Sequence, residues 1–282
     1  LAAMKRLSQL LSDRGFAKDR QLLPVYTSAL DIAAGTKSPS PVGSLIHALG
    51  ERGRMEFNEL LFNKTIAVTT IAPDYSGWAG WNTRANWSFF KNLRDLYRPI
   101  ARNDQHILWV RAGALPRPVE AKCEVTDWGF DRFEVTVESD QPGLASLFFE
   151  REGFDASART ALLTVTEDSP VTRAADKPQW GDFPRYGIAN ARFVEVAAPV
   201  EPGEVTKLTI EVMDGSAIGW GQCFARVYEP VDYAALPNLS QGVDQLIEEN
   251  SLAPIETRKA LRTALQCSRA TLVRHENRAG IK

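Results

Sequence analysis

Three Trp-Gly dipeptides are the residues of this sequence whose types and spacing could do chemistry: Trp128-Gly129, Trp180-Gly181 and Trp220-Gly221. Two of them stand beside a carboxylate and an arginine, and these groups together can hold a sugar ring by stacking and hydrogen bonding. The residues predicted to bind ligand are Trp128, Asp127, Trp180, Asp182, Arg185 and Tyr186. Both segments are predicted to lie between strands, where binding residues tend to lie. A structural interpretation stays open, because Trp-Gly is common where a strand meets a turn.

A second feature is the density of aromatic residues between positions 75 and 109. The set comprises Tyr75, Trp78, Trp81, Trp87, Phe89, Phe90, Tyr97 and Trp109. Aromatic faces beside polar groups can bind sugar rings. The same residues can instead form the core of a small lobe, and the sequence leaves both interpretations open.

The sequence predicts no catalytic residue, no cofactor and no metal site. The three histidines, His47, His106 and His275, lie far apart, and a structural role is the simpler interpretation. No GxSxG, Walker or GxGxxG motif occurs, and no Cys/His spacing is typical of zinc. Cys123 and Cys223 fall in predicted strands, where they either form a disulfide or stay buried free thiols.

The elements that must position these residues begin with alternating helices and strands, which favours a small α/β lobe. Helices are predicted over residues 3–13, 42–49 (closed by Gly50), 54–62 and 82–97, and strands over 23–28, 64–71 and 106–111. In the helix over 82–97, Phe89, Leu93, Leu96 and Tyr97 share one stripe that should pack on the last two strands. Trp87 lies about 160° from Phe89 and should meet different neighbours.

The pattern changes to strict alternation after a proline-containing linker at residues 115–119. Strands are predicted over residues 121–126, 132–138, 144–150, 160–166, 192–198, 205–213 and 222–229, followed by helices over 241–249 and 254–271. The expected class is therefore α+β: an α/β lobe (1–114), an antiparallel, jelly-roll-like β-sandwich (115–236) and a C-terminal helical segment (237–282).

Charge is distributed unevenly over these parts. Residues 1–114 carry an excess of basic residues and residues 115–236 an excess of acidic ones, although the whole chain has a net charge of −2. On the predicted helix, Arg84, Lys91, Arg94 and Arg98 should lie nearer to solvent and give the lobe a basic face. Such a face could meet anionic lipid headgroups. The alternative is an ordinary solvated surface, and no nucleic-acid partner is expected.

An ordered series of short motifs between residues 26 and 111 resembles a known class of proteins. The motifs are Tyr26-Thr-Ser, Lys37-Ser-Pro-Ser-Pro41, Leu45-Ile-His47-Ala-Leu-Gly50, Val68-Thr-Thr, Asp74-Tyr75, Trp78, Trp81, Arg84-Ala-Asn86-Trp87-Ser-Phe-Phe90, Tyr97-Arg-Pro99 and His106-Ile-Leu-Trp109-Val-Arg111. Together they resemble the soluble segment after the last membrane span of bacterial multi-pass glycosyltransferase-like proteins that use lipid-linked sugar donors. The β-rich part that follows is similar, at the level of fold, to carbohydrate-binding modules appended there.

The resemblance implies a location more than a chemistry. It places the chain on the periplasmic or extracytoplasmic face of the cytoplasmic membrane, as the non-catalytic C-terminal domain of a larger glycosyltransferase, where it docks acceptor glycan. The expected partners are a glycan or lipid-linked sugar and, through the parent protein, the membrane surface. The alternative is a stand-alone periplasmic or secreted module that binds carbohydrate or protein.

Overall fold

The computed structural model describes residues 21–26, 39–40, 42–45, 48, 50–63, 65–73, 79–112, 115–128, 132–152, 161–169, 185–189, 193–212 and 219–238. The helices predicted over 3–13, 241–249 and 254–271 lie outside these residues. So do Trp180 and Asp182.

The first lobe is built on a four-stranded mixed sheet with the order β1-β2-β4-β3. The strands are β1 (Gln21–Pro24), β2 (Thr65–Ile71), β3 (Tyr97–Arg102) and β4 (His106–Arg111). β1 pairs with β2 in parallel, and the other ladders are antiparallel. Three helices accompany the sheet, α3 (Gly50–Asn63), α4 (Ala79–Ala85) and α5 (Trp87–Leu96). Gly50 therefore begins a helix, and its predicted role as a C-terminal cap was wrong.

The second part is an antiparallel β-sandwich, as the alternating sequence predicted. Its eight strands follow the order β10-β7-β12-β5-β6-β11-β8-β9. They are β5 (Val119–Trp128), β6 (Arg132–Glu138), β7 (Gly143–Glu152), β8 (Ala161–Asp168), β9 (Arg185–Ala189), β10 (Phe193–Val200), β11 (Val205–Val212) and β12 (Gly219–Tyr228). Alternate residues of both layers, such as Val135, Leu147 and Ile210, are fully buried between them. The sequence missed β9.

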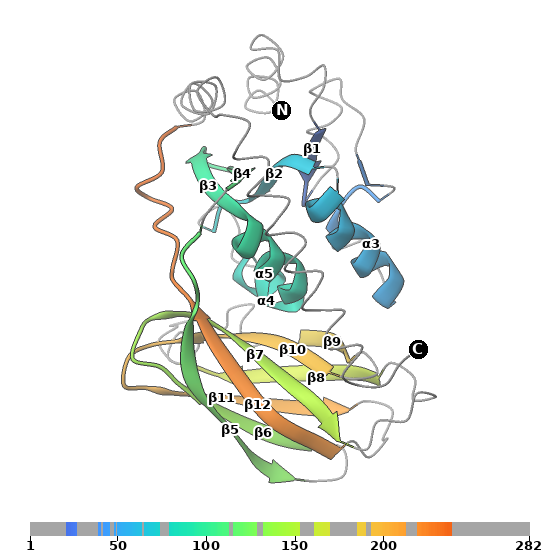
Figure 1. Cartoon of the computed structure of the whole chain (residues 1–282), viewed down its shortest axis with the longest axis vertical. Helices are drawn as coiled ribbons and strands as arrows, with labels where there is room; N and C mark the ends of the chain where they lie inside the picture. The colour runs from blue at the N-terminus through green and yellow to red at the C-terminus, as the bar shows by residue number, and fades with distance from the viewer. Residues whose placement is uncertain are drawn as a thin grey trace.

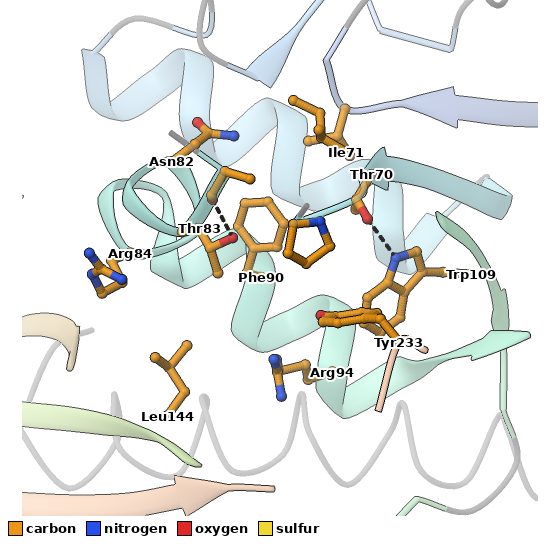
Figure 2. Close-up of a pocket in the computed structure, with 14 residues that line it drawn as sticks. Thr70, Ile71, Asn82, Thr83, Arg84, Phe90, Arg94, Trp109, Leu144 and Tyr233 are labelled. Carbon is orange, nitrogen blue, oxygen red and sulfur yellow. Dashed lines mark hydrogen bonds between the residues drawn. The ribbon is translucent and has the colours of Figure 1, made fainter. Parts of the chain in front are cut away.

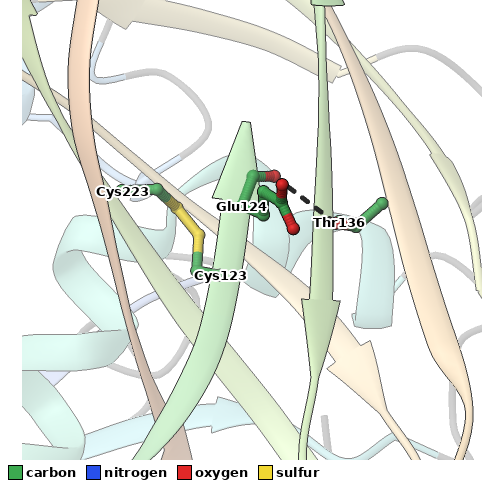
Figure 3. The surroundings of a disulfide bond; sticks show 4 residues. All are labelled: Cys123, Glu124, Thr136 and Cys223. Atoms are coloured by element: carbon green, nitrogen blue, oxygen red, sulfur yellow. Dashed lines mark hydrogen bonds between the residues drawn. A yellow bond between two sulfur atoms is a disulfide. The ribbon is translucent and has the colours of Figure 1, made fainter. Parts of the chain in front are cut away.

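A disulfide joins Cys123 on β5 to Cys223 on β12, with their Cα atoms 5.7 Å apart (Figure 3). It lies where β5 leaves one layer for the other. Residues up to Ala121 pair with β12, and residues from Lys122 onward pair with β6. Of the two states that the sequence left open, the structure therefore has the disulfide, which cross-links this corner of the sandwich.

The lobe sits on the sandwich through α4 and α5, which lie between the four-stranded sheet and the sandwich strands (Figure 1). α4 packs on β9 and β10, and α5 packs on β10. The chain then leaves β12 and returns along the lobe, where the N–H of Arg102 donates to the carbonyl of Pro237 at 2.9 Å. This last segment covers the edge strand β3. The domain boundaries at 114 and 236 stay a prediction.

The helix predicted over 82–97 is two helices that break at Asn86. The Asn86 amide Nδ2 donates to Asn82 Oδ1 at 2.9 Å and to the Asn82 carbonyl at 3.1 Å. Tyr97 and Pro99 belong to β3 and not to the helix. The predicted helical stripe is confirmed for Phe89 and Leu93, which are buried in one core with residues of β2 and β4, and for Leu96, which packs against that core, but not for Tyr97.

Candidate functional site: a pocket where the lobe meets the sandwich

A cavity of about 180 Å³ opens where the lobe, the sandwich and the returning chain meet (Figure 2). Its walls come from β2 and β4, from α4 and α5, from the start of β7 and from the segment after β12. The lining residues are Val25, Thr70, Ile71, Pro73, Ala79, Gly80, Asn82, Thr83, Arg84, Phe90, Arg94, Trp109, Leu144 and Tyr233. A water needs roughly 10–15 Å³ of such space, so the cavity offers roughly twelve to eighteen water-sized positions. A single sugar ring with its substituents fits a space of this size.

The break at Asn86 determines which helical side chains reach the cavity. α4 supplies Asn82, Thr83 and Arg84 from one direction, whereas α5 supplies Phe90 and Arg94 from another. A single straight helix would spread these residues along more than two turns, because each residue advances the axis by 1.5 Å. The break therefore lets two short helices surround one small volume.

Three aromatic rings line the cavity, and polar contacts fix two of them. The indole Nε1–H of Trp109 donates to Thr70 Oγ1 on the neighbouring strand at 2.8 Å. Tyr233 is half-buried, and its hydroxyl interacts with Arg94. Burial raises the pKa of Tyr233 and outweighs the opposing effect of Arg94, so the hydroxyl stays protonated. Phe90 is the third ring and is mostly buried.

Two arginines border the cavity, and the view in Figure 2 places Phe90 between Arg84 and Tyr233. Arg84 Nε lies 3.0 Å from Glu167 Oε2 of β8, and the Glu167 side chain is fully buried. Arg94 Nη1 donates to the carbonyl of Glu229 at 2.9 Å. Both guanidinium groups are therefore held in position by partners from the sandwich or from the chain that follows it.

The same contacts overturn the predicted solvent-facing basic surface. Arg84 and Lys91 reach across to the sandwich, with Lys91 Nζ 3.7 Å from Glu195 Oε1, and Arg94 reaches the chain just after β12. The Arg84 side chain is only 10% exposed, and only Arg98 of the four is exposed on its strand. Two basic residues of the lobe therefore form ion pairs with carboxylates of the sandwich at this boundary.

A buried hydrogen-bond chain fixes the boundary beside the cavity. Trp87 Nε1–H donates to Ser146 Oγ at 2.8 Å, and that hydroxyl donates to Glu195 Oε1 at 3.2 Å. The Tyr228 hydroxyl donates to Asp95 Oδ1 at 2.8 Å, and the Tyr228 ring packs edge-on against Trp87. Phe89 instead packs on Phe57 of α3. Trp87 thus faces different neighbours from Phe89, as the helix geometry predicted.

Burial changes the pKa values of the charged side chains at this boundary. It raises the pKa of the Glu195 carboxyl, although Lys91 and the Ser146 hydroxyl act in the opposite direction. Burial also opposes the charge of Lys91, but the carboxylates of Glu195 and Asp95 outweigh it and raise the pKa of the ammonium. Lys91 therefore stays charged, while Glu195 is the carboxyl of this group that protonates more readily than an ordinary glutamate.

The six ligand-binding residues predicted from the Trp-Gly dipeptides are not among the described residues that line this cavity. Their positions stay predictions: the structure describes only the backbones of Asp127 and Trp128 at the end of β5 and of Arg185 and Tyr186 at the start of β9. The backbone register puts Trp128 opposite Phe133, and Arg185 opposite Val165. Strands β6, β11 and β8 separate β5 from β9 in the sheet order.

Sequence reasoning found part of the cavity and missed part. Phe90 and Trp109 belong to the aromatic stretch for which both core packing and ligand contact were considered. Both are also buried in the same core as Trp87, Phe89 and Tyr97, so the core interpretation holds for all five. Asn82, Arg94 and Tyr233 were missed as site residues, because their convergence depends on how the sandwich docks. His106 is buried, and burial lowers its pKa, in line with the structural role proposed for it.

The part of the chain that the structure describes contains neither a metal-ligand cluster nor a membrane-spanning helix. Those residues contain no cluster of three or more His, Cys, Asp or Glu side chains able to hold a metal ion. Within the same residues, no helix combines the length and the apolar character needed to cross a membrane.

Comparison with known proteins gives similarity at low levels only. No protein-family description and no curated protein matches the chain. Among solved structures, a family 35 carbohydrate binding module from Clostridium thermocellum is 14% identical, with 41% of this chain and 100% of that chain covered and a TM-score of 0.20. The CBM22-1 xylan-binding domain of Xyn10C from Paenibacillus barcinonensis is 13% identical, with 39% of this chain and 83% of that chain covered and a TM-score of 0.20. The epithelial adhesin 9 A domain from Candida glabrata, in complex with Galb1-3GlcNAc, is 9% identical, with 39% of this chain and 55% of that chain covered and a TM-score of 0.17.

Proposed function

We propose that this chain is a carbohydrate-binding unit and that the cavity between the lobe and the sandwich is its sugar site. The observation that supports this most is the lining itself. Three aromatic rings, Phe90, Trp109 and Tyr233, stand around a space of one sugar ring, beside hydroxyl, amide and guanidinium groups. Aromatic faces combined with a few placed polar groups are how proteins bind sugars.

The lining favours binding over catalysis. None of the fourteen residues that line the cavity is a carboxylate, a histidine or a cysteine. Glycosidic bond cleavage commonly relies on a pair of carboxylic acids. A cavity with donors and rings but without a general acid or base can hold a sugar and not activate it.

The proposal extends to the setting of the protein. We infer that the chain is the extracytoplasmic C-terminal part of a membrane glycosyltransferase-like protein, where it docks acceptor glycan. The motifs between residues 26 and 111 support this parentage. The disulfide between Cys123 and Cys223 supports an oxidising compartment, because such bonds persist outside the cytosol. The upstream reading frame is the test: several apolar stretches of about 20 residues are expected, whereas a stand-alone module would have none.

The binding proposal is tested by measuring glycan-array binding of the wild-type protein and of matched variants. Tyr233→Ala removes one ring from the cavity and should weaken binding by on the order of 1–3 kcal/mol, the range for loss of a large buried aromatic contact. Phe224→Ala is the control, because Phe224 is 53% exposed on β12 and does not line the cavity.

Trp128→Ala is the third arm of the array, and it separates the cavity from the site predicted at the Trp-Gly dipeptides. The proposal expects loss with Tyr233→Ala and no change with the other two variants. Loss with Trp128→Ala alone would move the sugar site to the end of the sandwich. An absence of bound glycan for the wild-type protein would reject the carbohydrate-binding function.

A further inference from the structure

The polar groups around the cavity are mostly hydrogen-bond donors. Arg84 and Arg94 contribute two guanidinium groups, which donate and never accept. Thr70 Oγ1 already accepts from the indole of Trp109, so its hydroxyl proton is left to donate. Asn82 Oδ1 already accepts from Asn86, so the Asn82 NH₂ group is left as the donor of that side chain.

Acceptors are scarce in the same lining. Thr83 Oγ1 donates to the carbonyl of Ala79 at 2.9 Å and keeps its lone pairs. None of the described residues that line the cavity is a carboxylate. A sugar hydroxyl both donates and accepts, so a neutral sugar would leave its own protons with few partners here. An ionised carboxylate or phosphate only accepts, and it forms its strongest hydrogen bonds with arginine.

The charges of the side chains around the cavity also favour an anionic ligand. Glu167 is the one carboxylate paired with Arg84, and a carbonyl and a phenol hold Arg94 without neutralising it. Among the described residues no carboxylate forms an ion pair with Arg94, so the cavity wall carries one positive charge that is not compensated there. A partly enclosed positive charge attracts an anion more strongly than an exposed one, because water screens it less.

We propose that the cavity selects an acidic sugar, a single ring that bears a carboxylate or a phosphate group, with Arg94 as the residue that contacts the anion. The inference rests on the proposed carbohydrate-binding function and makes it specific. Tyr233, which is half-buried, provides a face for the ring, the buried Trp109 lines the wall, and Arg84, Asn82 and Thr70 provide further donors. Because Arg94 is fixed by the Glu229 carbonyl and by Tyr233, its charge is in place before the ligand arrives.

Isothermal titration calorimetry on the whole chain tests this with four probes: glucose, glucuronate, glucose 1-phosphate and inorganic phosphate. We expect an acidic sugar to bind at least about tenfold more tightly than glucose, the ratio that one charged hydrogen bond supplies. Its affinity should fall as salt is raised. Glucuronate above glucose 1-phosphate would identify a carboxylate as the anion, and the reverse order would identify a phosphate.

Variants of the arginines show which residue causes the preference for an acidic sugar over glucose. Arg94→Gln keeps a donor for the Glu229 carbonyl but removes the charge, and it should abolish the preference for the acidic sugar, measured as the ratio of the glucuronate affinity to the glucose affinity in the same variant. Arg98→Gln is the matched control, because it removes the same charge from an exposed position outside the cavity. Arg84→Gln alone would remove the ion-pair partner of the buried Glu167 side chain, so the double variant Arg84→Gln/Glu167→Gln is used instead.

Several results would overturn the inference. Equal affinity for glucose and glucuronate, or an unchanged preference in a folded Arg94→Gln protein, would show that the cavity does not select charge, and the carbohydrate-binding function would survive. Inorganic phosphate binding as tightly as glucose 1-phosphate would indicate an anion site with no sugar recognition. If none of the four probes binds, both the inference and the sugar site in this cavity are rejected.

Discussion

Replacing Trp87 with phenylalanine tests how firmly the lobe is attached to the sandwich. Trp87 is 2% exposed, and its indole N–H donates to the buried Ser146 hydroxyl across the boundary. The variant keeps an aromatic ring against Tyr228 but removes the donor and part of the ring. We estimate a loss of about 1 kcal/mol for the hydrogen bond and about 1–2 kcal/mol for the cavity left behind, so roughly 2–3 kcal/mol in all.

A double-mutant cycle isolates the contact between the two parts. Urea unfolding would be measured for Trp87→Phe, Ser146→Ala and the double variant, and the two single losses should exceed the combined loss by about 1 kcal/mol. Trp109→Phe with Ser146→Ala is the control pair, because Trp109 bonds to Thr70 within the lobe and shares no partner with Ser146. The control should be additive within about 0.5 kcal/mol. Additivity of the Trp87 pair to the same degree would refute the docking geometry.

Three further changes should have defined results. The Cys123→Ser/Cys223→Ser double variant removes a cross-link between residues that are 100 positions apart in the sequence. From the loss of loop-closure entropy, the free energy of unfolding should fall by about 4–5 kcal/mol. Reduction of the wild-type protein with dithiothreitol should give the same loss. The pKa of Glu195 is higher in the folded state than its ordinary value of 4.5. Its contribution to the free energy of unfolding is therefore full below about pH 4.5 and is lost as the pH rises through the folded pKa. Glu195→Gln should flatten the pH dependence of unfolding in that window, and an unchanged curve would contradict the burial of this carboxyl. Leu93→Asp places a charge at a position with no exposed surface and should unfold the lobe in a thermal melt, so an unchanged melting temperature would show that the helix register is wrong.

The sandwich was predictable from the sequence because its residues alternate by a simple period. Phe133, Val135 and Val137 are all buried, as their spacing predicted. β9 was missed because Arg185–Ala189 has only five residues and no clear alternation. The period is a local property, and it needs no knowledge of distant contacts.

The helix break and the strand that follows were not predictable in the same way. Asn82 and Asn86 are four residues apart, and their side chains bond to each other and to backbone in competition with a regular helix. Tyr97 follows a helical pattern, but it pairs with Arg111 at the start of β3. Proline at position 99 is tolerated there because β3 stands at one end of the four-stranded sheet order.

The cavity depended on contacts that no local pattern encodes. Arg94 and Tyr233 are 139 positions apart in the sequence, and they meet because the chain returns over the lobe after β12. The opposite charges of the two parts did indicate separate surfaces. They predicted neither that Arg84 and Lys91 would pair with sandwich carboxylates nor that a sugar-sized space would remain beside these pairs.

The most direct measurement of the central claim is an NMR titration of the tryptophan indole N–H signals with glucuronate and glucose. The signals would be assigned by Trp→Phe variants. The account predicts that the Trp109 signal shifts on addition of the sugar, because this ring lines the cavity, and that the Trp87 signal, buried at the lobe–sandwich boundary, does not. Shifts confined to Trp128 and Trp180, with Trp109 unchanged at saturation, would contradict the cavity as the sugar site.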